Sequence, residues 1–485
     1  MTTIQQALHI FQKDVREFRR EAAVVLVLSA ALVLLGVSTW ESIQEWRSRP
    51  DGDIGPLILL LPIAWCLLIA RVIHAEALPG DRHFWLTRPY SRTGLLLSKA
   101  MFILAFINVP LLIAQAAILW LSGFPLSSFL GGLLWNQVLI TALVLLPAAT
   151  VAALTRNLAQ FLPAIVLAAA VILPPFEESR IQPEWFGALL GVGVAGAIGG
   201  TILVLQYRRR QALRHAAITL GAAFIVILLY LAFPRSAAFA IQSTLIGGPA
   251  TTFSLQLGKA DAPPPIGTPN RYRQIVDLPL VPSGVSARNM EIESPEISFR
   301  TLSGVISRGS TRMTGSFLTS EGAGFSQHVS VDRSFYEAAK DSPVTVRGEY
   351  VVTLYGNEQP AEIPLDGSPV MIDGLGQCGT MPNQDRGTIL CRSPFHQWKN
   401  FSSDRVAQNY DYRPNLLTLL AIQPVGVRRY GLIGEGSAEV APQAPEKPLT
   451  LVVREPIGFF RYQMEVPNVR LSQYAILETR ANQEP

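Results

Sequence analysis

The chain has 485 residues, of which 49% are hydrophobic and 16% charged, and its formal net charge is +4. So small a net charge argues against a nucleic-acid-binding protein. The composition is also uneven, since residues 1–235 are dominated by Leu, Ala, Val and Ile, whereas residues 236–485 are polar and rich in Pro, Gly, Ser and Thr. Such a break predicts at least two domains.

Residues 1–21 predict an amphipathic helix ahead of the first apolar segment. Its apolar side chains recur every three or four residues, a spacing that places them on one helix face, and they are Ile4, Leu8, Phe11, Val15 and Phe18. Cationic side chains occupy the other faces. This pattern favours a helix lying at the inner membrane surface, with its apolar face against lipid. The alternative is a cytosolic helix packed on other protein.

Residues 22–235 predict a transmembrane domain of about seven spans. A membrane-spanning helix needs about 20 mostly apolar residues, because each residue adds about 1.5 Å and the hydrocarbon layer is about 30 Å thick. The candidate segments are 22–40, 56–73, 100–122, 129–155, 158–174, 186–206 and 216–233. The fifth is the shortest and contains Pro163. The fifth and sixth must cross together, or not at all, to keep the basic loop 207–215 on the inner side.

The distribution of Lys and Arg predicts that the N-terminus is cytoplasmic. With that orientation, the outer short loops hold only Arg47, Arg49 and Arg180. The inner segments hold thirteen cationic residues: Lys13, Arg16, Arg19, Arg20, Arg82, Arg88, Arg92, Lys99, Arg156, Arg208, Arg209, Arg210 and Arg214. Because cytoplasmic loops are enriched in Lys and Arg, we expect a multi-pass protein of the cell (inner) membrane. An odd number of spans then places the C-terminal half outside the cytoplasm.

Residues 236–272 read as a juxtamembrane linker, and residues 273–485 predict an extracytoplasmic, mainly-β, sandwich-like domain. Segments 297–307, 344–356 and 449–466 are rich in β-branched and aromatic residues with partial alternation. Turn signals such as "NEQP" (357–360), "PNQDRG" (382–387) and "DGSP" (366–369) separate the apolar runs. Only "SFYEAAKD" (334–341) predicts a short helix there.

The three cysteines fit this topology. Cys378 and Cys391 bracket a short polar loop, and a disulfide between them suits an oxidising compartment. Two free thiols are the alternative. Cys66 lies in the second predicted span and reads as a small apolar residue. No Cys or His spacing indicates a metal site.

Motif searches predict no catalysis by this chain. No phosphate-binding G-x-x-x-x-G-K-[ST] pattern occurs, and "GVGVAG" (191–196) lies inside the sixth span without a preceding strand. Small residues four apart there indicate helix packing instead, and they are Gly187, Gly191, Gly196 and Gly200. Asn136 and Gln137 form a polar pair inside the fourth span. They either hydrogen-bond between helices or line a transport pathway.

The inner loop between the second and third spans carries the strongest functional signal. Its sequence, "HAEALPGDRHFWLTRPYSRTGLLLSK" (74–99), resembles the cytoplasmic loop of ABC-2 type transporter permeases. The matching pattern is an acidic residue, a Thr-Arg-Pro, a Ser-Arg and a Lys that opens the next span. These positions are Glu76, Asp81, Phe84, Thr87, Arg88, Pro89, Ser91, Arg92 and Lys99. Pro89 disfavours helix at Arg88, and Ser91 can cap a new helix.

The resemblance covers roughly residues 1–210 and implies a permease subunit that works as a homo- or heterodimer. In that family the loop is a coupling helix that docks on a separate ABC ATPase subunit, so ATP and Mg would be bound by the partner and no cofactor by this chain. The alternative is that the loop arginines serve only as topology anchors. A seventh span and a large external domain depart from the family pattern. A second hypothesis is therefore a non-transporting, membrane-anchored module whose β domain binds cell-envelope components or relays a signal.

Overall fold

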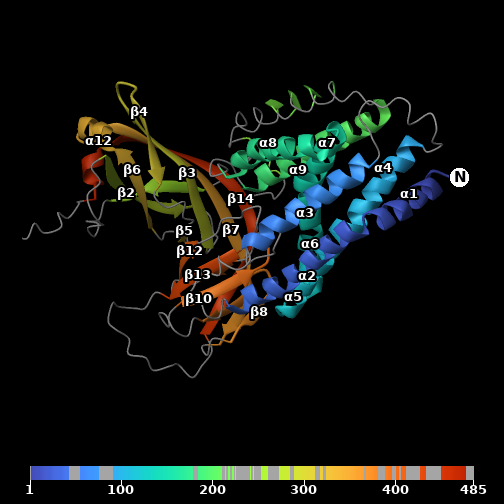
Figure 1. The fold of residues 1–485 in the computed structure, drawn as a ribbon. Helices are drawn as coiled ribbons and strands as arrows, with labels where there is room; N and C mark the ends of the chain where they lie inside the picture. Colours follow the sequence, from blue (N-terminus) through green and yellow to red (C-terminus); the bar gives the residue numbers. More distant parts are fainter. Residues whose placement is uncertain are drawn as a thin grey trace, which may run out of the picture. The chain divides into compact units, whose positions relative to one another are not determined.

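A computed structural model describes residues 2–42, 55–75, 91–177, 184–209, 253–259, 272–284, 289–311, 317–319, 324–364, 368–380, 388–395, 400–402, 406–410, 426–432 and 449–476, with isolated positions between 214 and 244. The chain divides into two units, the first mainly Met1–Pro234 and the second mainly Arg235–Arg392 and Val427–Pro485. The described part of the first unit is helical, and antiparallel strands dominate the second (Figure 1).

The helical unit consists of long helices, two of which contain a π-helical segment. Its elements are α1 (Thr3–Glu17), α2 (Arg19–Ser42), α3 (Gly55–His74), α4 (Arg92–Ile103), the π-helical η2 (Leu104–Asn108), α5 (Val109–Leu121), α6 (Leu126–Ile140), the π-helical η3 (Thr141–Leu145), α7 (Leu146–Leu154), α8 (Leu158–Glu177) and α9 (Glu184–Arg209). Six of the predicted spans therefore coincide with helices.

Within the described residues, three helices are long and apolar enough to cross a membrane, namely Arg19–Val37, Arg92–Leu121 and Leu126–Leu154. The prediction of seven spans is not met. The apolar stretches Leu59–His74, Leu158–Ala168 and Gly196–Tyr207 have only 10–17 residues. They are the parts with described side chains of α3, α8 and α9, helices of 20, 20 and 26 residues. The seventh predicted span, 216–233, falls largely outside the described residues.

The helical unit buries apolar side chains such as Trp65 and Leu111, but its burial pattern differs in two ways from that of a water-soluble bundle. Large apolar side chains are exposed on several helices, among them Leu34 (75%), Ile113 (64%), Trp120 (68%) and Val166 (67%). Polar and charged side chains are buried at the same time: Asp14, Lys99, Asn108, Gln115, Asn136 and Gln137. Helices that meet lipid face no penalty for exposed leucine, whereas their polar groups need partners inside the protein.

The β unit is built on one nine-stranded antiparallel sheet in the order β1-β2-β6-β4-β3-β7-β14-β11, with β5 paired to β3. The strands are β1 (Ser254–Leu257), β2 (Arg273–Ser283), β3 (Asn289–Thr301), β4 (Ile306–Thr311), β5 (Phe317–Thr319), β6 (Phe325–Asp332), β7 (Val344–Ile363), β11 (Asn400–Ser402) and β14 (Leu449–Val469). The short helix α12 (Arg333–Ala339) confirms the helix predicted at 334–341.

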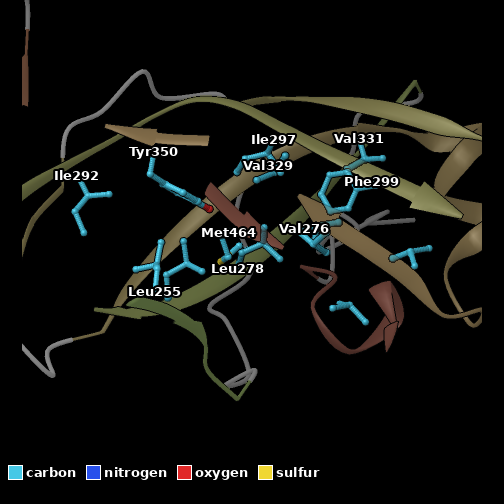
Figure 2. Packing of buried hydrophobic residues seen from close by; sticks show 14 of the residues in the cluster. Leu255, Val276, Leu278, Ile292, Ile297, Phe299, Val329, Val331, Tyr350 and Met464 are labelled. Atoms are coloured by element: carbon cyan, nitrogen blue, oxygen red, sulfur yellow. The ribbon is translucent and has the colours of Figure 1, made fainter. Parts of the chain in front are cut away.

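This sheet folds over on itself, so that its two limbs enclose one apolar core. Phe253, just before β1, contacts Phe460 and Tyr462 of β14 with ring centroids 5.2 and 5.0 Å apart. Figure 2 shows side chains from β1, β2 and β6 meeting those from β3, β7 and β14. The Tyr350 hydroxyl donates to Gln327 Oε1 over 3.3 Å within this core, and burial raises the pKa of Tyr350. The predicted sandwich-like layering therefore arises from one continuous sheet, because β4 pairs with both limbs.

A second, five-stranded sheet carries the disulfide. Its order is β12-β13-β10-β9-β8, and its strands are β8 (Val370–Ile372), β9 (Gly376–Thr380), β10 (Thr388–Ser393), β12 (Val406–Tyr410) and β13 (Gly426–Leu432). Cys378 and Cys391 lie directly opposite each other on β9 and β10 and are disulfide-bonded, which confirms the predicted pairing. Both are fully buried in a small core that includes Leu451 and Val453 of β14.

Two sequence predictions in the β unit are wrong in detail. Segment 297–307 is a hairpin rather than one strand, because Gly304, at φ +87°, lets the chain reverse between β3 and β4. The "NEQP" segment is not a turn between strands but lies within β7. There Asn357 adopts φ +52°, and the pairing with β14 shifts register between Val453 and Glu455, which makes this point of the strand a β-bulge.

Candidate functional site

The helix that follows the predicted coupling loop, α4, has a hydrogen-bonded cap at its N-terminus. Ser91 Oγ accepts from the backbone N–H of Gly94 at 3.1 Å, which confirms Ser91 as the cap of α4. The backbone N–H of Ser91 in turn donates to Gln6 Oε1 of α1 over 3.1 Å. Arg92 is the first residue of α4 and is exposed. The loop therefore enters a rigid helix that is already attached to α1.

The two helices approach closely at their first turns. A Cβ atom added to Gly94 would lie 3.4 Å from the backbone oxygen of Thr3 and 2.9 Å from Ser91 Oγ. A side chain at position 94 would thus push α1 and α4 apart or displace the cap. The first turn of α1 is itself fixed by reciprocal hydrogen bonds between Thr2 and Gln5.

A buried ion pair joins α1 to α4 one turn further on. Lys99 Nζ lies 2.8 Å from Asp14 Oδ2, and the exposed fractions of the two side chains are 3% and 0%. The same helices also contact each other through aromatic rings, since Phe102 of α4 lies against Phe11 and Phe18 with ring centroids 6.4 Å apart. Removing one member of the ion pair would leave the other charge buried without its counter-charge, which is strongly destabilising. The ion pair therefore holds α1 and the start of α4 together.

This packing revises the predicted role of the N-terminal helix. The stripe that faces α4 is Ala7, Ile10 and Asp14, all buried, whereas Ile4 and Leu8 remain 64% and 41% exposed. The face chosen from the apolar periodicity is therefore split between protein and surroundings. The reason is that a buried carboxylate with a partner on another helix is invisible to a hydrophobic pattern.

The other end of the loop is anchored as well. His74 ends α3, and its Nε2 lies 3.0 Å from the Ala152 carbonyl oxygen and 3.1 Å from Thr155 Oγ1. Because a carbonyl can only accept, Nε2 carries the proton in this arrangement. Arg71, one turn earlier, pairs with Glu21 of α2 at 3.3 Å. The loop thus joins α3, held to α2 and α7, to α4, held to α1.

The core of the Thr-Arg-Pro motif is not among the positions that the structure describes. Glu76, Asp81, Phe84, Thr87, Arg88 and Pro89 fall in the undescribed segment 76–90, whereas Ser91, Arg92 and Lys99 are described. Their suggested role in docking an ATPase stays a prediction.

A second candidate region is a buried polar cluster between Arg92–Leu121 and Leu126–Leu154. Asn108 Nδ2 donates to Thr141 Oγ1 at 2.7 Å and to Gln137 Oε1 at 3.4 Å. Gln137 Nε2 donates to Gln115 Oε1 at 3.0 Å. Gln137 therefore hydrogen-bonds between helices, which was one of its two predicted roles. Asn136 is also buried, at 3% exposure.

The sequence analysis missed Asn108 and Gln115, although a signal for them exists. They are seven residues apart, a spacing that places both on one helix face, and the rest of segment 100–121 is apolar. Isolated amides in such a segment need partners, because an unpaired amide in an apolar interior is costly.

The polar cluster coincides with the two π-helical segments. In η2 the N–H of Val109 bonds to Leu104 O, and in η3 the N–H of Leu146 bonds to Thr141 O, five residues back in each case. A proline follows each segment by two residues, at Pro110 and Pro147. Proline lacks an N–H and clashes with the carbonyl four residues earlier, which here lies inside the π-helical segment. The backbones are thus locally loosened where the polar side chains meet.

The predicted glycine packing does not occur within the described chain at the two positions that can be assessed. A Cβ added to Gly196 or Gly200 would meet nothing within 4 Å. The close approach is at Gly199 instead, where a Cβ would lie 3.4 Å from Thr150 Oγ1 of α7. Gly187 and Gly191 lie in α9, outside the described side chains.

Among the described residues, no three His, Cys, Asp or Glu side chains come together in a way that could hold a metal ion. The chain matches no family model, no curated protein and no solved structure.

Proposed function

We propose that this chain is the transmembrane permease subunit of an ABC-2 type transporter, coupling ATP hydrolysis by a separate ATPase subunit to movement of a substrate across the membrane. It lies in the cell (inner) membrane, with a cytoplasmic N-terminus and an extracytoplasmic β domain. It pairs with a second permease, identical or different, and catalyses no reaction itself. ATP and Mg are bound by the ATPase partner.

The observation that carries this proposal is the buried Asp14–Lys99 pair. Lys99 is the last position of the loop pattern that resembles the ABC-2 family, and its ammonium lies 2.8 Å from Asp14 Oδ2. If the loop were displaced, α4 and α1 would therefore move together, because the ion pair joins them. Helix α4 continues into η2 and α5, which carry Asn108 and Gln115 of the buried polar cluster, 9 and 16 residues after Lys99. Movement of α4 would therefore also move these two side chains.

The test is co-purification with an ABC ATPase subunit from the same cells, in the wild type and in a variant carrying Arg88→Glu and Pro89→Ala. We expect the variant to lose the ATPase, because Arg88 would pair with carboxylates of the partner. Arg156→Glu is the matched control, since Arg156 is an exposed cation of the next inner loop. Unchanged assembly and transport in the Arg88/Pro89 variant would refute the coupling role of the loop.

The second candidate function is a non-transporting membrane anchor for the β unit, which binds cell-envelope components or relays a signal. The size of that unit favours it, because two sheets, two apolar cores and a disulfide make an assembly far larger than a loop. Recovery of the chain without any ATPase, together with an envelope protein or glycan, would support this function over transport.

A further inference from the structure

The turn between β3 and β4 presents a cluster of exposed apolar side chains at the tip of a hairpin. Leu302, Val305 and Ile306 are 81%, 56% and 52% exposed. Burial of large apolar side chains is the rule in the rest of this sheet, where Phe299 of the same hairpin is fully buried. Three neighbouring apolar side chains that remain exposed at the tip of a hairpin indicate an interaction surface.

The tip is held in one conformation by its own hydrogen bonds. The backbone N–H of Thr301 donates to Val305 O at 3.0 Å, and the N–H of Val305 donates to Thr301 Oγ1 at 3.1 Å. Thr301 Oγ1 also lies 2.9 Å from Ser303 Oγ. Gly304 closes the turn at φ +87°, where other residues would be strained. The apolar side chains are therefore displayed by a preformed turn, so that binding requires little further ordering.

Cationic side chains stand directly behind the tip. Arg300 lies opposite Ile306 and Arg308 lies opposite Ser298, on the face away from the core, because the intervening pair Phe299 and Ser307 is buried. Both arginines are exposed. Segment 297–311 contains these two cations and no Asp or Glu. Arg347, the next cation across the sheet, lies 4.0 Å from Glu465.

We propose that this hairpin tip, Leu302–Ile306 with Arg300 and Arg308, inserts into the headgroup layer of an anionic lipid bilayer. A short apolar tip can enter the boundary between headgroups and acyl chains, while cations one strand step behind it meet the lipid phosphates. The β unit then has a lipid contact of its own, which the transporter proposal neither requires nor provides.

The experiment uses the full chain in lipid nanodiscs, with Cys66→Ala and with an environment-sensitive fluorophore attached to Ser303→Cys. The probe is phosphatidylglycerol, supplied either within the disc or as separate vesicles, and the comparison is phosphatidylcholine alone. We expect a blue shift of emission, and a loss of emission with nitroxide-labelled lipid, in the presence of phosphatidylglycerol. The same label on Gln359→Cys, an exposed position far along β7, should show neither.

Two variants separate the contributions of the tip. Leu302→Ser with Val305→Ser should abolish the shift, and Arg300→Gln with Arg308→Gln should raise the amount of phosphatidylglycerol needed to produce it. All four positions are exposed, so that folding of the β unit is preserved. Emission that stays at its water-exposed value in both lipid arrangements would overturn the proposal and would leave a protein partner as the occupant of this surface.

Discussion

The two units of this chain differ in the side chains that they bury and expose. The β unit buries Val276, Leu278 and Val329 completely in a core of more than twenty residues. The helical unit also buries apolar side chains such as Trp65, but it buries the ion pair of Asp14 and Lys99 as well and leaves leucines such as Leu34 exposed. Exposed leucine on long apolar helices suits a lipid environment, because lipid tails are as apolar as leucine.

The difference also changes what makes each unit specific. In the β unit, removal of apolar area from water drives the sheet to fold over. In the helical unit, buried hydrogen bonds and an ion pair join helices that are far apart in the sequence. The Asp14–Lys99 pair and the Asn108–Thr141 bond are the clearest instances.

The largest effect is expected at the buried ion pair. Lys99→Met should destabilise the helical unit by about 3–5 kcal/mol, because it leaves the Asp14 carboxylate buried without its counter-charge. The readout is the thermal midpoint of the detergent-solubilised chain. Lys13→Met is the control, since Lys13 is 46% exposed and its pairing with Glu17 contributes at most about 1 kcal/mol.

Asp14→Leu combined with Lys99→Met should recover most of that loss, because an apolar pair removes the desolvation cost. A double variant as unstable as Lys99→Met alone would show that the residues act through other contacts.

The next effect tests the surroundings of each unit directly. Leu34→Asp in α2 should weaken membrane integration by up to about 3 kcal/mol, the cost of a carboxylate at the centre of a span, because its charge would meet hydrocarbon. Leu302→Asp in the β unit should change chain stability by less than about 0.5 kcal/mol. The two leucines are similarly exposed, at 75% and 81%, so that only their surroundings differ. Alkaline extraction of membranes measures the first effect and thermal unfolding the second.

Equal behaviour of these two aspartate variants would contradict the assignment of α2 to lipid. The exposed apolar side chains of the helical unit would then have to be explained by a protein partner that covers them.

Breaking the disulfide should have a moderate effect that is confined to the β unit. Cys378→Ser with Cys391→Ser should cost about 2–3 kcal/mol, because the bond closes a loop of 13 residues and the paired side chains fill a small core. Mass spectrometry after alkylation, with and without reductant, should label these cysteines only after reduction. Labelling of the native protein at Cys378 would refute the bond.

The smallest effect is expected in the polar cluster. Asn108→Leu should cost about 1 kcal/mol, since hydrogen bonds between membrane helices contribute modestly even in an apolar interior. A double-mutant cycle with Thr141→Val measures the coupling between the two side chains. Ser29→Ala is the control, because its buried hydroxyl bonds within its own helix, to Val25 O at 2.8 Å. A coupling energy of zero would show that the cluster does not link the helices.

Local patterns in the sequence predicted the elements of this protein. Apolar runs of helical length located six of the helices, and alternating β-branched residues located β7 and β14. The Ser91 cap and the Cys378–Cys391 pairing also followed from neighbours along the chain. These predictions succeed because caps, short loops and periodic faces depend on residues a few positions apart.

Only the tertiary structure shows which side chains from distant parts of the sequence contact each other. Asp14 and Lys99 are 85 residues apart, and nothing in the local pattern pairs them. The same holds for Asn108 and Thr141, and for the contact between Phe253 and Phe460 that closes the sheet. For α1, the apolar pattern located Phe11 and Phe18, which contact Phe102, but gave no sign that Asp14, which lies between them in the sequence, is buried. Sequence periodicity reports which side chains avoid water, whereas the choice of partner depends on contacts between distant segments that form only when the chain is folded.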